Sequence, residues 1–211
     1  QQLKDFIDEE DPKNPSSPYG STKYVIERLL KDLYLNEKEE WKIANLRYFN
    51  PIGAHSSGMI GEDPRGLPNN LFPLITKVAL GQKPFLQIFG DNWETEDGTC
   101  IRDYIHVMDL AEGHYAVLNY LLNNSYQLLN LNLGTGKGTS VLELLETFEE
   151  TNKVKIPYEI IGRREGDVAK LVANNQLALK ILNWNPTRDT KDMCRDGWKW
   201  QLKNPKGYQL N

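Results

Sequence analysis

The sequence predicts an α/β fold. Segments in which apolar residues recur every three or four positions, as in helices, alternate with short apolar runs that are typical of buried strands. The chain has 211 residues, of which 39% are hydrophobic and 26% charged, so it can bury a core in one or two domains. No internal repeat or low-complexity tract interrupts this pattern.

The charge and hydropathy of the chain argue against several kinds of partner. Its net charge is -4 with no long basic run, whereas nucleic-acid binding needs clustered Lys and Arg. No apolar stretch approaches the ~18 residues of a membrane span, and residues 1–5 lack the pattern of a signal peptide. We therefore expect a cytoplasmic enzyme with no nucleic-acid partner and no membrane association.

The cysteines and histidines do not form a recognisable metal site. Cys100 and Cys194 have no close partner in the sequence, which suits reduced thiols. The histidines, which are His55, His106 and His114, lack ligand spacing with Cys, Asp or Glu, so packed or surface roles are favoured. We expect no bound metal.

The first half of the chain begins with a polar segment. Residues 1–14 predict a loop or a fraying end. Apolar spacing then predicts a helix over residues 19–36, and residues 41–49 predict a buried strand. That strand places Asn50 at its C-terminal end, where open α/β sheets bind ligands. The following elements are a loop over 53–68, a helix over 71–78, a strand over 86–89 and an acidic loop over 90–99.

In the second half, helix signals are clearest. Asp109 lies near the start of a helix that extends through Leu121. Ser140, followed three residues later by Glu143, forms a capping box that starts a helix over residues 141–152. The other elements expected here are strands over 127–133 and 158–161 and helices over 175–182 and 190–203.

The glycine-rich segment at residues 134–138 predicts a tight turn. A dinucleotide-binding fingerprint needs a third glycine three residues after the second, where this chain has Thr139. It also needs an acidic residue about 20 residues further on. The phosphate-loop pattern fails as well, so we do not assign phosphate binding to this segment.

Tyr19 and Lys23 lie one helical turn apart, so their side chains share one face. An ammonium about 4 Å from a phenolate contributes about 4 kcal/mol at an effective dielectric of about 20. That is about what lowering a phenol pKa from about 10 to neutral pH requires. The pair is physically adequate as a general base, although an isolated pair of this kind more often marks a solvated helix face.

Further motifs follow this pair in a distinctive order. The sequence reads YGSTK at 19–23, RYFNPIG at 47–53, GLPNNL at 66–71, TEDGT at 95–99, RDYIHV at 102–107 and RREGD at 163–167. In this order they resemble the UDP-glucose (UDP-galactose) 4-epimerases of the extended short-chain dehydrogenase/reductase superfamily. The resemblance runs from about Pro15 to Tyr208.

The resemblance implies a C-terminal remnant of a Rossmann-type parallel sheet plus a smaller α/β substrate-binding domain. Residues 1–52 would be the last part of the NAD-binding domain and residues 53–211 the UDP-sugar-binding domain, with about 103–134 packing back on the NAD-binding sheet. In the family, the glycine-rich NAD-binding loop precedes the tyrosine, and only 18 residues precede Tyr19 here. We therefore expect a C-terminal portion that is inactive alone.

The resemblance also implies the reaction: NAD-dependent interconversion of UDP-glucose and UDP-galactose through oxidation at C4, rotation of the 4-keto sugar and re-reduction. Tyr19 matches the base for the sugar 4-hydroxyl, and Lys23 matches the residue that stabilises the phenolate and bonds the nicotinamide ribose. Tyr48 and Phe49 match positions beside the nicotinamide. Apolar surface on the helix after Tyr19 is expected to be exposed.

By the same resemblance, three residues match the clamp on the uridine diphosphate: Arg102, Arg164 and Asp167. Two guanidinium groups can neutralise a diphosphate through forked hydrogen bonds, and a carboxylate can accept from the ribose hydroxyls. The other matching substrate contacts are Asn50, Asn70, Leu71, Gln87 and Phe89. Each arginine alone more often forms a surface ion pair, so the assignment depends on the surrounding motifs.

Leu171 matches the position that limits sugar size in the family, where a tyrosine narrows the pocket against N-acetylated sugars. The smaller leucine gives the hypothesis that UDP-N-acetylglucosamine is accepted as well as UDP-glucose. Two alternatives remain open: another nucleotide-sugar enzyme, such as a 4,6-dehydratase or decarboxylase, and a non-catalytic UDP-sugar-binding module. A homodimer is expected of the full-length parent only.

Overall fold

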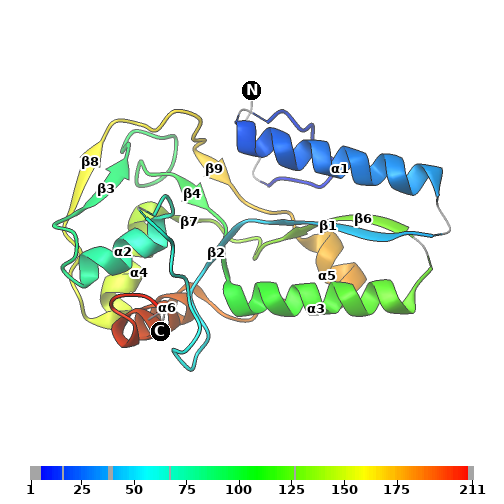
Figure 1. Ribbon diagram of the computed structural model, residues 1–211. Coiled ribbons are helices and arrows are strands. Elements are labelled where there is room, and N and C mark those ends of the chain that lie inside the picture. Colours follow the sequence, from blue (N-terminus) through cyan, green and yellow to red (C-terminus); the bar gives the residue numbers. More distant parts are fainter. Residues whose placement is uncertain (1–5, 16, 38–39, 67, 126, 209–211) are drawn as a thin grey trace.

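The computed structural model describes residues 6–208 apart from 16, 38–39, 67 and 126 (Figure 1). Over these residues the helices are α1 (Pro18–Asn36), α2 (Leu71–Ala79), α3 (Val107–Asn123), α4 (Val141–Asn152), α5 (Gln176–Leu182) and α6 (Thr190–Lys203). The strands are β1 (Lys42–Tyr48), β2 (Asn50–Ile52), β3 (Leu86–Phe89), β4 (Ile101–Arg102), β5 (Tyr104–His106), β6 (Gln127–Leu133), β7 (Thr139–Ser140), β8 (Tyr158–Ile161) and β9 (Lys170–Leu171). The predicted α/β class is confirmed.

One half of the molecule is built on the parallel pair β1–β6, which runs in register from Lys42 beside Gln127 to Tyr48 beside Leu133. Figure 1 shows α1 on one side of this pair and α3 with α5 on the other. The core on the α3 side is apolar and consists of Ile105, Leu110, Val117, Leu131, Leu133, Ala178 and Trp184. Burial of these side chains fixes α3 and α5 against the sheet.

The other half has its own core. The parallel pair β3–β8 brings Phe89 beside Ile161, and α2, α4 and α6 pack near it (Figure 1). Phe148 lies at the centre of this core, with its ring edge-on to both Phe72 and Trp198 at centroid distances of 6.0 and 5.7 Å. The predicted capping box at the start of α4 is confirmed: the Ser140 hydroxyl accepts from the Glu143 amide, and the Glu143 carboxylate accepts from the Ser140 amide.

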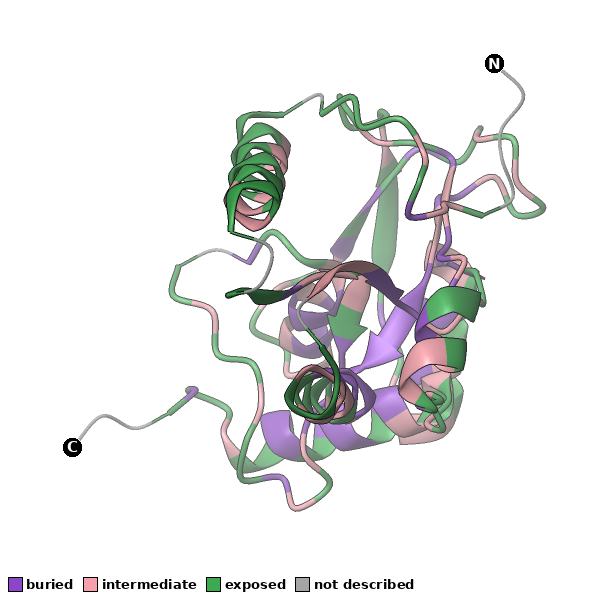
Figure 2. Cartoon of the chain, turned by 90° about the vertical axis from the view of Figure 1, so that its right-hand side faces the viewer, coloured by how far each residue is buried: buried purple, intermediate pink, exposed green. Residues whose placement is uncertain are grey.

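Helix α1 differs from the other helices because none of its residues is buried (Figure 2). Several of its apolar side chains are about half exposed or more, including Val25 at 52%, Ile26 at 48% and Leu29 at 62%, whereas Leu30 and Leu33 are partly buried. The expected exposure of apolar surface on this helix is confirmed. Hydrophobic burial therefore contributes little to holding α1 in place, so polar contacts are more important for its position.

Two segments without regular structure are held by buried carboxylates. The expectation of a fraying end over residues 1–14 is wrong for Ile7 and Glu9: Ile7 forms a parallel bridge with Ala173, and the buried Glu9 accepts a hydrogen bond from the Asn132 amide at 2.8 Å. At the predicted turn, Asp103 accepts hydrogen bonds from the amides of Thr135 and Gly136, each at 2.9 Å. These amides donate to a carboxylate of the protein itself, as expected of a structural turn.

The sequence did not predict the short strands β2, β4, β5, β7 and β9. They contain two or three residues each, too few to show a period of two. They nevertheless carry the side chains of the site, because β4 lies between β7 and β9 and places Arg102 beside Leu171.

Candidate functional site

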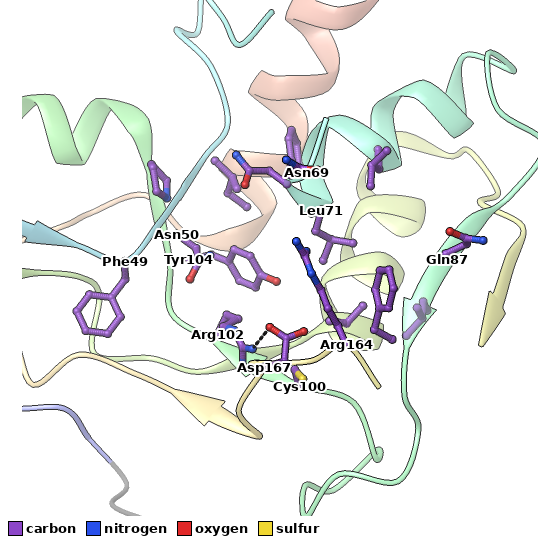
Figure 3. Close-up of a pocket in the computed structure, with 18 residues that line it drawn as sticks. Phe49, Asn50, Asn69, Leu71, Gln87, Cys100, Arg102, Tyr104, Arg164 and Asp167 are labelled. Carbon is purple, nitrogen blue, oxygen red and sulfur yellow. Dashed lines mark hydrogen bonds and ion pairs between the residues drawn. The ribbon is translucent and has the colours of Figure 1, made fainter. Parts of the chain in front are cut away.

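Most of the predicted substrate-binding residues line one cavity of about 330 Å³, here called the arginine cavity (Figure 3). Strand β2, the start of α2, strands β3 and β4, and the loop after β8 contribute to its wall. The predicted residues that line it are Phe49, Asn50, Asn70, Leu71, Gln87, Phe89, Arg102, Arg164 and Asp167. The structure thus brings together residues that are more than 100 positions apart in the sequence.

Arg102 is held rigidly at this wall. Its Nη1 donates to the carbonyl oxygens of Ile101 and Val168 at 2.9 and 2.8 Å, and its Nη2 donates to Asp167 Oδ1 at 3.3 Å (Figure 3). Only 14% of the side chain is exposed. A charge that is already oriented and largely desolvated needs little reorganisation to bind an anion.

Arg164 approaches the same cavity from the loop between β8 and β9. Its Cζ lies 6.0 Å from the centre of the Phe89 ring, and Figure 3 shows its side chain extending into the cavity toward Leu71. Among the described residues, no carboxylate or carbonyl accepts a hydrogen bond from its guanidinium group. Arg164 therefore presents unused donors to the cavity, whereas Arg102 is already bound to the protein.

Sequence analysis missed Tyr104, Asn69 and Cys100, which also line the arginine cavity. Tyr104 is 6% exposed, and burial raises the pKa of its phenol. Burial likewise raises the pKa of the Cys100 thiol. Both lie two positions from Arg102, and residues two apart on an extended segment share a face, so this spacing could have identified them.

A second cavity of about 540 Å³, here called the lysine cavity, adjoins the first and shares Phe49 and Asn50 with it. Lys23 enters it from α1, Tyr48 from the end of β1 and Leu171 from β9. The Tyr48 ring is 53% exposed, with its centre 5.7 Å from that of His114. The residues expected at the reacting end and at the sugar-size position therefore gather beside those expected at the diphosphate.

Tyr19 is the exception among the expected residues. It lines neither cavity, and its side chain is 72% exposed. The Lys23 ammonium lies 5.2 Å from the centre of the Tyr19 ring, so the two side chains do share a face of α1. The expected pairing is present, but the structure does not place the Tyr19 hydroxyl in either cavity.

No group of three or more His, Cys, Asp or Glu side chains in the described part of the chain is placed to hold a metal ion. None of the helices there has the length and hydropathy needed to span a bilayer.

Comparisons with known proteins agree with the geometry. A family model described as GDP-mannose 4,6 dehydratase matches residues 1–197. A UDP-glucose 4-epimerase from Dictyostelium discoideum is 49% identical over 202 residues, which is 96% of this chain and 58% of that protein. Bifunctional protein GAL10 from Pachysolen tannophilus is 51% identical over 207 residues, which is 97% of this chain and 30% of that protein.

Solved structures resemble the whole described fold. The UDP-glucose 4-epimerase from Stenotrophomonas maltophila, with NAD and formylated UDP-arabinopyranose, has a TM-score of 0.92 and 48% identity, covering 95% of this chain and 59% of that one. The enzyme from Bifidobacterium longum, with NAD+ and UDP, has a TM-score of 0.91 and 44% identity, covering 96% and 60%. The predicted resemblance is confirmed, and the chain spans less than two thirds of each of these relatives.

Proposed function

This chain belongs to the family described as GDP-mannose 4,6 dehydratase, and from that premise we propose that it supplies the nucleotide-sugar site and the Tyr19–Lys23 pair of an NAD-dependent UDP-glucose 4-epimerase. One observation carries the proposal. The cavity lined by Arg102 and Arg164 shares a wall with the cavity lined by Lys23. A single elongated ligand can therefore reach both the arginines and the lysine.

The arginine cavity would hold the uridine diphosphate. Arg102 and Arg164 supply guanidinium donors for the phosphate oxygens, and Asp167, already bound to Arg102, offers its other carboxylate oxygen to the ribose hydroxyls. Gln87 and Phe89 would lie along the base. The amide groups of Asn50 and Asn70 and the apolar side chain of Leu71 would line the path from the phosphates to the sugar.

The sugar would extend into the lysine cavity, where Leu171 borders it. In the proposed step, Tyr19 Oη accepts the proton of the sugar 4-hydroxyl and returns it at the end of the reaction, while Lys23 stabilises the phenolate. Because Tyr19 is exposed, this step requires its hydroxyl to turn toward the lysine cavity. Its exposed side chain has space for that rotation.

The lysine cavity also has the chemistry expected for part of an NAD site. Lys23 is a donor suited to ribose hydroxyls, and Tyr48 and Phe49 are aromatic rings suited to a flat heterocycle. When bound, NAD would supply a hydride acceptor and donor for the sugar carbon. The side chains named here would hold only the nicotinamide end.

We also propose a division into two units: residues 1–52 with an NAD-binding domain and 53–211 for the UDP-sugar, with about 103–134 returning to the first unit. The full pairing of β6 with β1 supports that return. The two separate hydrophobic cores support a division into two units, and the core of the first unit also includes Ala178 and Trp184 from the C-terminal part of the chain. For the whole protein we propose a cytoplasmic homodimer that acts on UDP-sugars and binds neither nucleic acid nor membranes. The net charge of -4 of these 211 residues, which have no long basic run, supports the absence of a nucleic-acid partner.

Two other functions are compatible with some of these observations. A 4,6-dehydratase is favoured by the description of the family model, but the relatives near 50% identity named above include a UDP-glucose 4-epimerase and no dehydratase. A non-catalytic UDP-sugar-binding module fits the same cavities. Titration of the 211-residue chain with UDP-glucose and, separately, GDP-mannose distinguishes an epimerase site from a GDP-mannose dehydratase site, and turnover by a longer protein distinguishes the enzyme from the non-catalytic module.

We expect calorimetry to give saturable binding of UDP-glucose and much weaker binding of GDP-mannose, with no turnover after NAD+ is added. Preferential binding of GDP-mannose would contradict the epimerase proposal. Turnover by this chain with NAD+ would contradict the proposal that it is inactive alone. A longer protein that contains this chain and converts no UDP-sugar would support the non-catalytic module.

A further inference from the structure

Two loops leave the same end of the parallel pair β3–β8 and contact each other. One loop follows Phe89 and includes Asn92 and Trp93, and the other follows Ile161 and includes residues 162–167. The second loop carries Arg164 and Asp167. Its position therefore determines where two of the three proposed diphosphate and ribose contacts lie.

Arg163 joins the two loops. Its guanidinium carbon lies 4.1 Å from the centre of the Trp93 ring, a stacking distance for a cation on an aromatic face. Its Nε donates to Asn92 Oδ1 at 2.7 Å, and its Nη2 donates to the Asn92 carbonyl oxygen. Trp93 is itself fixed, because its indole nitrogen donates to the Phe89 carbonyl oxygen at 3.1 Å.

The loop has little other support near Arg164. Gly162 and Gly166 flank it and have no side chains to restrain it, and Gly166 has a φ of +85°, which favours glycine. At its far end, Asp167 is bound to Arg102. Among the described residues, the side chains of Arg164 and Glu165 make no hydrogen bond to the rest of the protein.

We propose that Arg163, stacked on Trp93 and bonded to Asn92, is a positioning residue that aims the neighbouring Arg164 into the arginine cavity. This inference rests on the proposed function, because its effect is exerted on the diphosphate. The two adjacent arginines have different surroundings. Arg163 stacks on Trp93 outside the cavity, and Arg164 lies near Phe89 inside it. Fixing the loop before the ligand arrives lowers the entropy cost of binding.

The test measures UDP affinity of the 211-residue chain by calorimetry in Trp93→Leu, Trp93→Phe and Asn92→Ala. None of these substitutions changes the net charge, so long-range attraction of UDP is unaltered. We expect Trp93→Leu and Asn92→Ala to weaken UDP binding at least about threefold. Trp93→Phe keeps an aromatic face for Arg163 and should stay within about twofold of the unmodified chain.

Coupling to Arg164 separates positioning from a general loss of structure. In an Arg164→Met background, Trp93→Leu should no longer weaken UDP binding, because the residue through which it acts is gone.

The outcomes distinguish this inference from the function on which it rests. If the unmodified chain binds UDP and Trp93→Leu and Asn92→Ala bind it equally well, the positioning role is wrong and the proposed function stands. If Trp93→Leu weakens binding equally with and without Arg164, the role is also wrong, because the loss is then structural. If the unmodified chain does not bind UDP, both proposals are overturned.

Discussion

Arg47 donates two parallel hydrogen bonds to the carboxylate of Glu27, from Nε to Oε1 at 2.7 Å and from Nη2 to Oε2 at 2.8 Å. Tyr19, Lys23 and Glu27 are spaced four residues apart, so they lie on one face of α1. No residue of α1 is buried, and this doubly hydrogen-bonded ion pair joins that face of the helix to β1. We expect this ion pair to hold in place the face of α1 that carries Tyr19 and Lys23.

The ion pair between Glu27 and Arg47 should hold α1 in place. Glu27→Gln leaves Arg47 partly buried without its charged partner, and we expect a local loss of about 1–3 kcal/mol. Amide hydrogen exchange measured by mass spectrometry should become faster throughout residues 18–36. Asp32→Asn, at an exposed position on the same helix, is the matched control and should leave exchange unchanged. Equal exchange in both variants would show that the ion pair does not hold α1.

The same pair predicts a pH dependence. Burial acts to raise the pKa of Glu27, but hydrogen bonds and charge from Arg47 and Lys13 outweigh it, so the pKa is lowered from 4.5. A carboxyl whose folded pKa is lowered stabilises the fold above its unfolded pKa and loses that contribution as pH falls through the folded value. Urea unfolding at pH 6 and pH 3 should therefore show a smaller stability difference in Glu27→Gln than in the unmodified chain. An identical loss of stability between pH 6 and pH 3 in both proteins would show that Glu27 does not contribute to the pH dependence.

The two arginines of the arginine cavity should differ when substituted. Hydrogen bonds to charged groups contribute about 1.5–3 kcal/mol, so Arg102→Met and Arg164→Met should each weaken UDP binding about 10- to 100-fold. Arg102→Met should also lower the melting temperature, because it frees Asp167 and two carbonyls. Arg164→Met should leave the melting temperature unchanged, since its guanidinium has no described hydrogen-bond acceptor.

Arg28→Met, at an exposed position on α1, removes the same charge and is the control for this comparison. Its UDP affinity should remain within about twofold of the unmodified chain, because exposed charges beyond a Debye length are screened at ordinary salt. Equal losses in all three variants would mean that net charge, not the arginine cavity, attracts UDP.

The leucine at position 171 predicts which UDP-sugars the chain binds. The unmodified chain should bind UDP-glucose and UDP-N-acetylglucosamine with similar affinity, because a leucine at the border of the lysine cavity leaves space for the acetamido group. Leu171→Tyr should weaken binding of the N-acetylated sugar about tenfold or more and leave binding of UDP itself unchanged. The hypothesis fails if the unmodified chain discriminates strongly against UDP-N-acetylglucosamine.

Sequence patterns predicted the helices well because they have strong local signals. The capping box at Ser140 and Glu143 and the apolar period of α3 require no knowledge of distant residues. The short strands were missed, because their formation depends on partners elsewhere in the fold. Strand β4, for example, exists only where β7 and β9 reach it.

For the site, the structure brings Arg102, Arg164 and Asp167, which come from separate sequence motifs, to one cavity. The orientation of Tyr19 was not predictable from spacing, because a residue four positions from Lys23 shares its face whether or not its hydroxyl points into a cavity. The contact between Trp93 and Arg163 joins residues 70 positions apart and has no local signal. Such contacts depend on the tertiary packing of the loops.

The central claim is that Arg102 and Arg164 bind the same diphosphate. A crystal structure of the 211-residue chain with UDP tests it most directly. We expect both phosphates in the arginine cavity, with oxygen atoms within about 3.2 Å of each guanidinium group and the ribose beside Asp167. UDP bound elsewhere, or bound in the cavity with its phosphates turned away from either arginine, would contradict the claim.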